Sequence, residues 1–160
     1  MNKEQEFRAG VRLYLESLDQ DIEPVLAKLI AYQYPQEVGS IDFEIFVDAF
    51  TQEFPVRAFF MDSSNSEFFI YVDGKAEYPA PVAPELLNIP CVYSEEFEEA
   101  FTESDEEFDP WHHATEVLIE WFSEKWLNAG GTSFGLKATI SPHNSPHKFN
   151  LITSEWQSRC

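Results

Sequence analysis

The residues best suited to chemistry in this chain are its four histidines, which occur as His112 with His113 and His143 with His147. Imidazole groups beside carboxylates can ligate a divalent metal or exchange protons near neutral pH. A helix through the first pair would point His113 outward on a face with three carboxylates, Glu116, Glu120 and Glu124. Because the chain has no HExxH motif and no cysteine beside these residues, ion pairing on a helix surface is favoured, and no metal site is predicted.

The second histidine pair and the two cysteines are also interpreted as structural. His143 and His147 lie in SPHNSPHKF, where two prolines disfavour helical i,i+4 geometry, so we expect turn residues. Cys91 follows a proline in the apolar stretch NIPCVY and is interpreted as a small buried hydrophobic residue. Cys160 is the last residue, and a bridge to it would constrain little, so two free thiols and a reducing compartment are predicted.

No further motif supports catalysis. The chain lacks a GxSxG nucleophile elbow, a phosphate-binding glycine loop and a GxGxxG fingerprint. The acidic run ESDEEFD suggests calcium, but a helix-loop-helix calcium site needs alternating oxygen ligands around a central glycine, and residues 104–110 contain none. We therefore predict no catalytic residue and no cofactor.

The most unusual stretch is YSEEFEEAFTESDEEFDP, residues 93–110, which carries nine carboxylates and no lysine or arginine. Helical spacing from Glu95 to Glu103 would place Phe97 and Phe101 on one side and most carboxylates in water. A charge run of this kind is commonly only a solvated surface. The absence of lysine and arginine between Lys75 and Lys125 instead favours a function, because the repulsion is not relieved locally. The predicted partner-binding residues are Glu95, Glu96, Phe97, Glu98, Glu99, Phe101, Glu103, Asp105, Glu106 and Glu107.

The overall charge has the same sign as this stretch. Against 29 aspartates and glutamates stand 10 lysines and arginines, which gives a formal net charge of −19. Such a field repels nucleic acids and anionic bilayers and attracts basic proteins. The partner predicted from charge is therefore a basic protein, and neither nucleic acid nor a membrane is expected to bind.

The elements that must position these residues follow from the hydrophobic periodicity. Two N-terminal helices are predicted between Glu4 and Tyr34, with Pro24 in the first turn of the second. Alternation in IDFEIFVDAF predicts a strand, and VRAFFMD with EFFIYVDG predicts a hairpin around a serine-rich turn. Four prolines between Tyr78 and Pro90 argue against central sheet there.

The C-terminal half contains the clearest helix signal. Asp109 as N-cap and Pro110 in the first turn predict a helix over about 110–128, which ends at Gly130 or Gly131. Its apolar arc, which includes Trp111, Trp121 and Trp126, is wider than one sheet normally covers. Two more strands, TSFGLKATIS and HKFNLITSEW, are predicted to follow, with Trp156 joining the same aromatic cluster.

This order of elements predicts a single α+β domain over residues 1–160, with helices packed on one face of an antiparallel sheet. No secretory leader or membrane span is recognised, so a cytoplasmic protein is expected. The favoured hypothesis is a non-catalytic acidic binding module, of the inhibitor or immunity type by analogy of charge and size. The alternatives are a small enzyme or ligand-binding protein with a pocket between sheet and helices, and a homo-oligomeric accessory protein that buries its aromatic residues in a homodimer.

Overall fold

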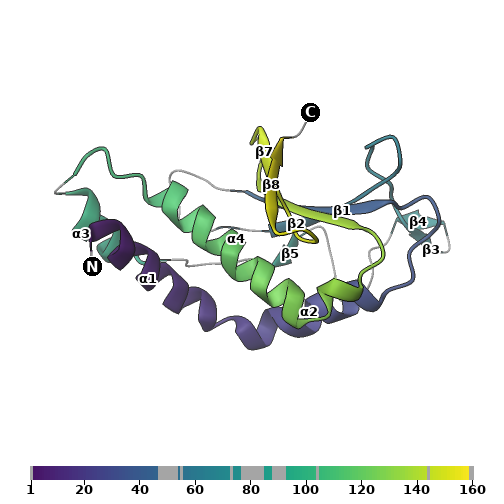
Figure 1. Ribbon diagram of the computed structural model, residues 1–160, viewed down its shortest axis with the longest axis horizontal. Helices are drawn as coiled ribbons and strands as arrows, with labels where there is room; N and C mark the ends of the chain where they lie inside the picture. The colour runs from purple at the N-terminus through teal and green to yellow at the C-terminus, as the bar shows by residue number, and fades with distance from the viewer. Residues whose placement is uncertain are drawn as a thin grey trace.

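Helices form one layer of the protein and a sheet forms the other (Figure 1). The computed structural model describes residues 2–46, 54, 56–72, 74–76, 85–87, 93–103, 105–143 and 145–158. The helices lie on one side of the sheet, and the last two strands rise from it on the other side. The predicted α+β class with helices on one face is therefore confirmed.

Three of the four α-helices begin at a side-chain cap. The helices are α1 (Lys3–Glu16), α2 (Asp19–Ala31), α3 (Glu95–Thr102) and α4 (Pro110–Asn128), and a 3₁₀ turn, η1, covers Gly131–Ser133. The predicted cap of α4 is confirmed, because the Asp109 carboxylate accepts a hydrogen bond from the backbone N–H of His112 at 3.1 Å. Pro24 lies inside α2 and not in its first turn, because α2 begins at Asp19.

The main sheet has the strand order β5-β2-β1-β6-β7-β8, and β3 and β4 form a separate pair. The strands are β1 (Ser40–Ile45), β2 (Val56–Met61), β3 (Tyr71–Val72), β4 (Lys75–Ala76), β5 (Glu85–Leu87), β6 (Lys137–Pro142), β7 (His147–Asn150) and β8 (Glu155–Ser158). The pairing of β1 with β6 is parallel and the other pairings are antiparallel, so the sheet is mixed. The parallel pair arises because a long connection that includes α3 and α4 returns the chain to the same end of the sheet.

Helix α4 lies between the sheet and the N-terminal helices. The rings of Phe122 and Trp126 pack 4.9 and 5.7 Å from the ring of Phe43 on β1. On its other flank, α4 contacts both α1 and α2. Two sets of neighbours therefore cover the wide apolar arc of α4, and Trp121 and Trp126 are fully buried.

Two strand predictions need correction: the hairpin after β2 forms only in part, and HKFNLITSEW is not a single strand. Asp62 turns the chain after β2 by accepting hydrogen bonds from the backbone of Ser64 and Ser66, as the hairpin requires. The returning arm makes only an isolated bridge from Glu67 to Met61, because β5 occupies the free edge of β2.

HKFNLITSEW forms two strands and not one, because a turn over residues 151–154 separates β7 from β8. Trp156 on β8 is 51% exposed and packs on Phe149, away from the tryptophans of α4. The predictions for residues 47–50 and for Cys91 and Cys160 concern residues outside the described part of the chain. The four prolines of residues 79–90 also lie outside it, but the described residues among them form β5 at the edge of the sheet, which agrees with the argument against central sheet.

Candidate functional site

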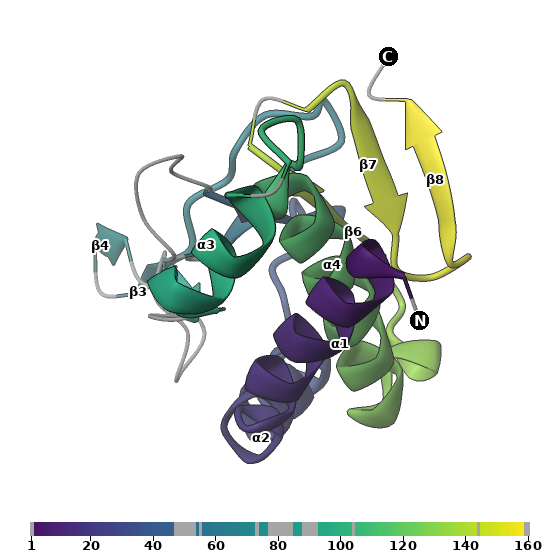
Figure 2. The same ribbon diagram turned by 90° about the vertical axis from the view of Figure 1, so that its left-hand side faces the viewer.

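The acidic stretch forms the short helix α3 and the loop that leads to α4, at one end of the molecule (Figure 2). Ser94 caps α3 by accepting a hydrogen bond from the backbone N–H of Phe97 at 3.1 Å. In the loop, the Asp105 carboxylate accepts one from the backbone N–H of Glu107, also at 3.1 Å. Besides Asp109, which caps α4, seven carboxylates of this region are solvent-exposed and are called the acidic surface: Glu95, Glu96, Glu99, Glu103, Asp105, Glu106 and Glu107.

The phenylalanines of α3 face the protein interior. Phe101 is buried and Phe97 is half-buried, and both rings pack 5.3 to 5.4 Å from the ring of Phe7 on α1. Phe108, in the loop, packs on the same ring at 5.2 Å. Phe97 and Phe101 were predicted to contact a partner, but the structure uses them to attach α3 to α1, because Phe7 offers a nearby apolar surface.

No ion pair joins the acidic surface to a lysine or arginine within the described part of the chain. The ion pairs of Arg8, Arg12 and Lys125 use carboxylates of α1, α2 and α4. Glu98, the eighth carboxylate predicted to bind a partner, is half-buried and has its own interactions. The acidic surface therefore keeps its charge exposed.

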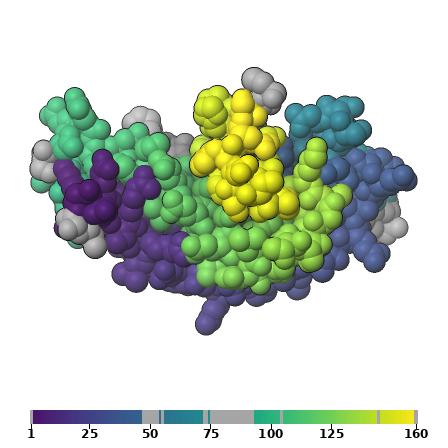
Figure 3. All heavy atoms as spheres, in the orientation of Figure 1, coloured from purple at the N-terminus to yellow at the C-terminus, as the bar shows by residue number. Residues whose placement is uncertain are grey.

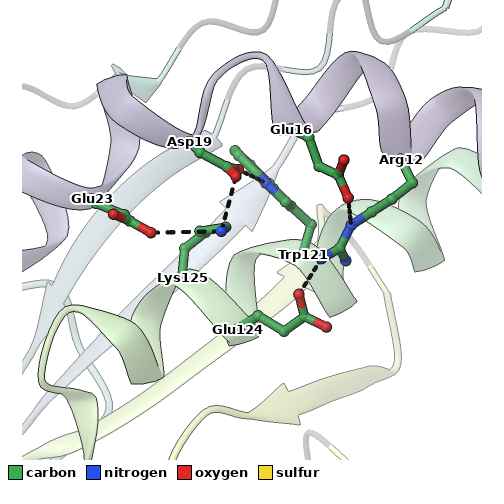
Figure 4. A network of polar contacts seen from close by, with 7 residues as sticks. All are labelled: Arg12, Glu16, Asp19, Glu23, Trp121, Glu124 and Lys125. Carbon is green, nitrogen blue, oxygen red and sulfur yellow. Dashed lines mark hydrogen bonds and ion pairs between the residues drawn. The ribbon is translucent and has the colours of Figure 1, made fainter.

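The cationic groups of the helical layer serve packing between helices (Figure 4). The Lys125 ammonium lies 3.1 Å from Asp19 and 3.5 Å from Glu23, and Asp19 also accepts a hydrogen bond from the Trp121 indole at 2.7 Å. Burial alone would raise the pKa of Asp19, but the hydrogen bonds from Trp121 and Lys125 lower it. Burial alone would lower the pKa of Lys125, but Asp19 and Glu23 raise it. This network ties α4 to α2 and is structural.

A pocket of about 500 Å³ lies between the N-terminal half of α4 and the last three strands, and is called the Trp156 pocket. Its helical wall carries residues at one-face spacing, His112, Thr115, Glu116 and Ile119. Its opposite wall carries Pro142, Ser145, His147 and Trp156. The volume lies within the range of small-ligand and side-chain pockets.

A cluster of charged and aromatic groups adjoins the pocket at His112 and Glu116. His112 Nε2 lies 2.5 Å from Glu116 Oε1, and an Arg8 guanidinium nitrogen lies 3.3 Å from the same oxygen. Arg8 Nε also donates to His113 Nδ1 at 3.0 Å. Burial and the charge of Arg8 lower the pKa of His113. The lowered pKa favours the neutral imidazole, whose Nδ1 can accept the hydrogen bond from Arg8. His113 was predicted to point outward, but it is half-buried and stacks on Phe108, because α1 covers that side of α4.

The uncovered face of the sheet holds a second, polar hollow of about 490 Å³. Asp42 lies in it and accepts a hydrogen bond from the Thr139 hydroxyl at 2.9 Å. His143, at the edge of this face, lies 3.5 Å from Glu44 and stacks on Phe46 at 4.4 Å. Among the described residues, no three histidine, cysteine, aspartate or glutamate side chains are arranged to hold a metal ion.

The fold and the exposed charge define an α+β protein with an acidic surface at one end and a mainly apolar pocket beside α4. Comparison with known protein families, with characterised proteins and with solved structures finds no match. Within the described ranges, none of the helices combines the length and apolarity that crossing a bilayer requires.

The sequence allowed a pocket between sheet and helices but did not identify the residues of the Trp156 pocket, because its walls come from residues 112–119 and 142–156, which meet only in the folded chain. An aromatic residue in an otherwise polar terminal strand was the one available signal. Trp156 was instead assigned to the core.

Proposed function

We propose that this protein is a non-catalytic binding module whose acidic surface docks a basic protein partner, as an inhibitor or immunity-type protein would. The observation that carries this proposal is that seven exposed carboxylates have no cationic partner within the described residues. Complementary charge accelerates encounter between proteins and fixes their relative orientation. An excess of carboxylates at one end of the molecule suits that role.

The attachment of α3 supports the same proposal. A helix of eight residues is too short to be stable alone in water, so the packing of Phe97 and Phe101 on Phe7 fixes it in place. A preorganised acidic surface loses less conformational entropy on binding than a mobile acidic segment would. Since these rings pack on Phe7, we expect a partner to find further apolar contacts elsewhere on the surface.

Charge-neutral variants test this proposal. We expect the fourfold variant E95Q/E96Q/E98Q/E99Q, called the α3 variant, to associate with a labelled octalysine peptide about ten-fold more slowly at low salt. Stopped-flow fluorescence measures this rate across a salt series, and the slope of rate against salt should also decrease.

The matched control removes the same charge elsewhere, at four exposed carboxylates outside the acidic surface, Asp21, Glu37, Glu67 and Glu120. This control should change the rate less than about two-fold. Equal slowing in both variants would show that net charge acts without a defined site, and would refute the proposal.

A further inference from the structure

The Trp156 pocket combines an apolar interior with polar groups that have unused bonding capacity. Ile119 is 2% exposed and forms part of its floor, and the Trp156 indole is 51% exposed at its edge. The ion-pair distances from Glu116 to Arg8 and His112 are both to Oε1, and no hydrogen bond to Oε2 occurs among the described residues. A carboxylate accepts up to about four hydrogen bonds, so Glu116 can still accept more.

We propose that this pocket receives an arginine side chain of the basic partner, an inference that rests on the proposed function. A guanidinium is planar, stacks on an indole face and donates two parallel hydrogen bonds to a carboxylate. Its aliphatic stem would pack on Ile119 and Pro142. Lysine matches the pocket less well, because its compact ammonium is more strongly hydrated and does not stack.

The resident arginine does not fill this place. Arg8 approaches Glu116 from α1 and is held there by its second hydrogen bond, to His113. It therefore occupies the α1 side of Glu116 and leaves Oε2 for a group that enters from solvent. The remaining negative field of the protein favours a second cation near this carboxylate, even though Arg8 neutralises part of its charge.

The position of the pocket links it to the acidic surface. Asp109 caps α4 directly after the acidic loop, and His112, at the edge of the pocket, lies in the first turn of the same helix. The N-terminal half of α4 lies between α3 and the β7–β8 hairpin in both ribbon views (Figures 1 and 2). In the space-filling view the C-terminal strands (yellow) lie against α4 (green) near the middle of the molecule, and the acidic loop lies toward its left end (Figure 3). One partner of standard interface size can cover both features.

Trp156 also supplies what the acidic surface lacks. Charged rims add little affinity without a desolvated aromatic or arginine contact near the centre of an interface. Phe97 and Phe101 are used by the core, whereas Trp156 is exposed beside a preformed pocket. The partner's arginine and Trp156 would together form such a contact.

Labelled octa-arginine and octalysine peptides test the inference, because both are attracted to the acidic surface and only arginine stacks. We expect octa-arginine to bind about five-fold more tightly, which is the equivalent of about 1 kcal/mol for the planar stacking and paired hydrogen bonds that lysine cannot make. W156A should abolish this ratio, whereas Y71A, which removes another exposed aromatic residue, should retain it. In NMR spectra, the indole N–H signal that is absent from W156A should be the one that octa-arginine shifts most.

The inference is wrong if the two peptides bind equally to the unmodified protein, or if W156A keeps the preference for arginine. The α3 variant separates this inference from the proposed function. It should weaken both peptides alike and leave the ratio unchanged. If it binds both peptides as tightly as the unmodified protein, the proposed function fails, and the ratio alone still decides whether the pocket selects arginine.

Discussion

Replacement of Asp19 should show how much the network of Asp19, Lys125 and Trp121 stabilises the packing of the helices. Asp19 contacts both groups, at 3.1 and 2.7 Å (Figure 4). Lys125 is 11% exposed at its side chain and Trp121 is fully buried, so both lose a partner that water replaces poorly. Asp19→Ala removes both contacts, whereas Asp19→Asn retains an oxygen that can accept from Trp121.

The expected magnitude follows from these contacts. An unsatisfied buried donor costs about 1–3 kcal/mol, and a lost hydrogen bond to a charged group costs a similar amount. Asp19 is 31% exposed and Lys125 keeps Glu23 at 3.5 Å, so the two contributions do not add fully. We expect Asp19→Ala to reduce the free energy of unfolding by about 2–3 kcal/mol and Asp19→Asn by about 1 kcal/mol.

Urea denaturation followed by tryptophan fluorescence measures these differences, because a change in midpoint at constant slope reports stability. Glu23→Gln is the matched control. Its longer contact and greater exposure predict a loss of less than about 0.5 kcal/mol. A loss for Asp19→Ala that is no larger than that of Glu23→Gln would refute the claim that this network stabilises the packing of α4.

Two further predictions concern the same layer. Gly131→Ala should destabilise the protein by about 2 kcal/mol in urea denaturation, because its added Cβ would lie 2.3 Å from Trp126 Cδ1, whereas Gly135→Ala, with no atom within 4 Å, should be nearly neutral. Stability should begin to fall below about pH 6.5, because the lowered pKa of His113 means that the fold disfavours the protonated imidazole. It should fall further below about pH 4, because the lowered pKa of Asp19 stabilises the fold only while its carboxylate is ionised. It should also fall above about pH 10.5, because the raised pKa of Lys125 stabilises only the charged amine. Asp19→Asn should make the loss at acid pH shallower, and an unchanged acid profile would contradict this assignment.

Much of the fold was predictable from local signals. The helical periods and caps gave α1, α2, α3 and α4 within a few residues, and alternation gave β1 with its buried face. Pairing depended on the whole chain and was predicted less well. The edge of β2 is taken by β5 and not by the adjacent segment, which no local pattern indicates.

The candidate site was predictable only in its charged part. Helical spacing showed that Phe97 and Phe101 share a side, but not that Phe7 lies opposite them, because Phe7 is distant in sequence. The same limit applies to His113, which a single-helix projection pointed outward. Arg8 comes from α1, and only the tertiary packing of α1 on α4 brings it to His113. Long-range contacts therefore decide which side chains remain available to a partner.

The charge pattern of α3 indicates whether its carboxylates serve more than solubility. Glu95 and Glu99 are spaced i,i+4 and repel each other, and Glu103 follows the last turn, where the helix dipole disfavours a carboxylate. Only the first-turn carboxylates gain from the dipole. The helix persists because its phenylalanines pack on Phe7, so core packing offsets the repulsion. A surface needed only for solubility could intersperse lysines and avoid this cost, and the retained charge therefore favours recognition of a cationic partner.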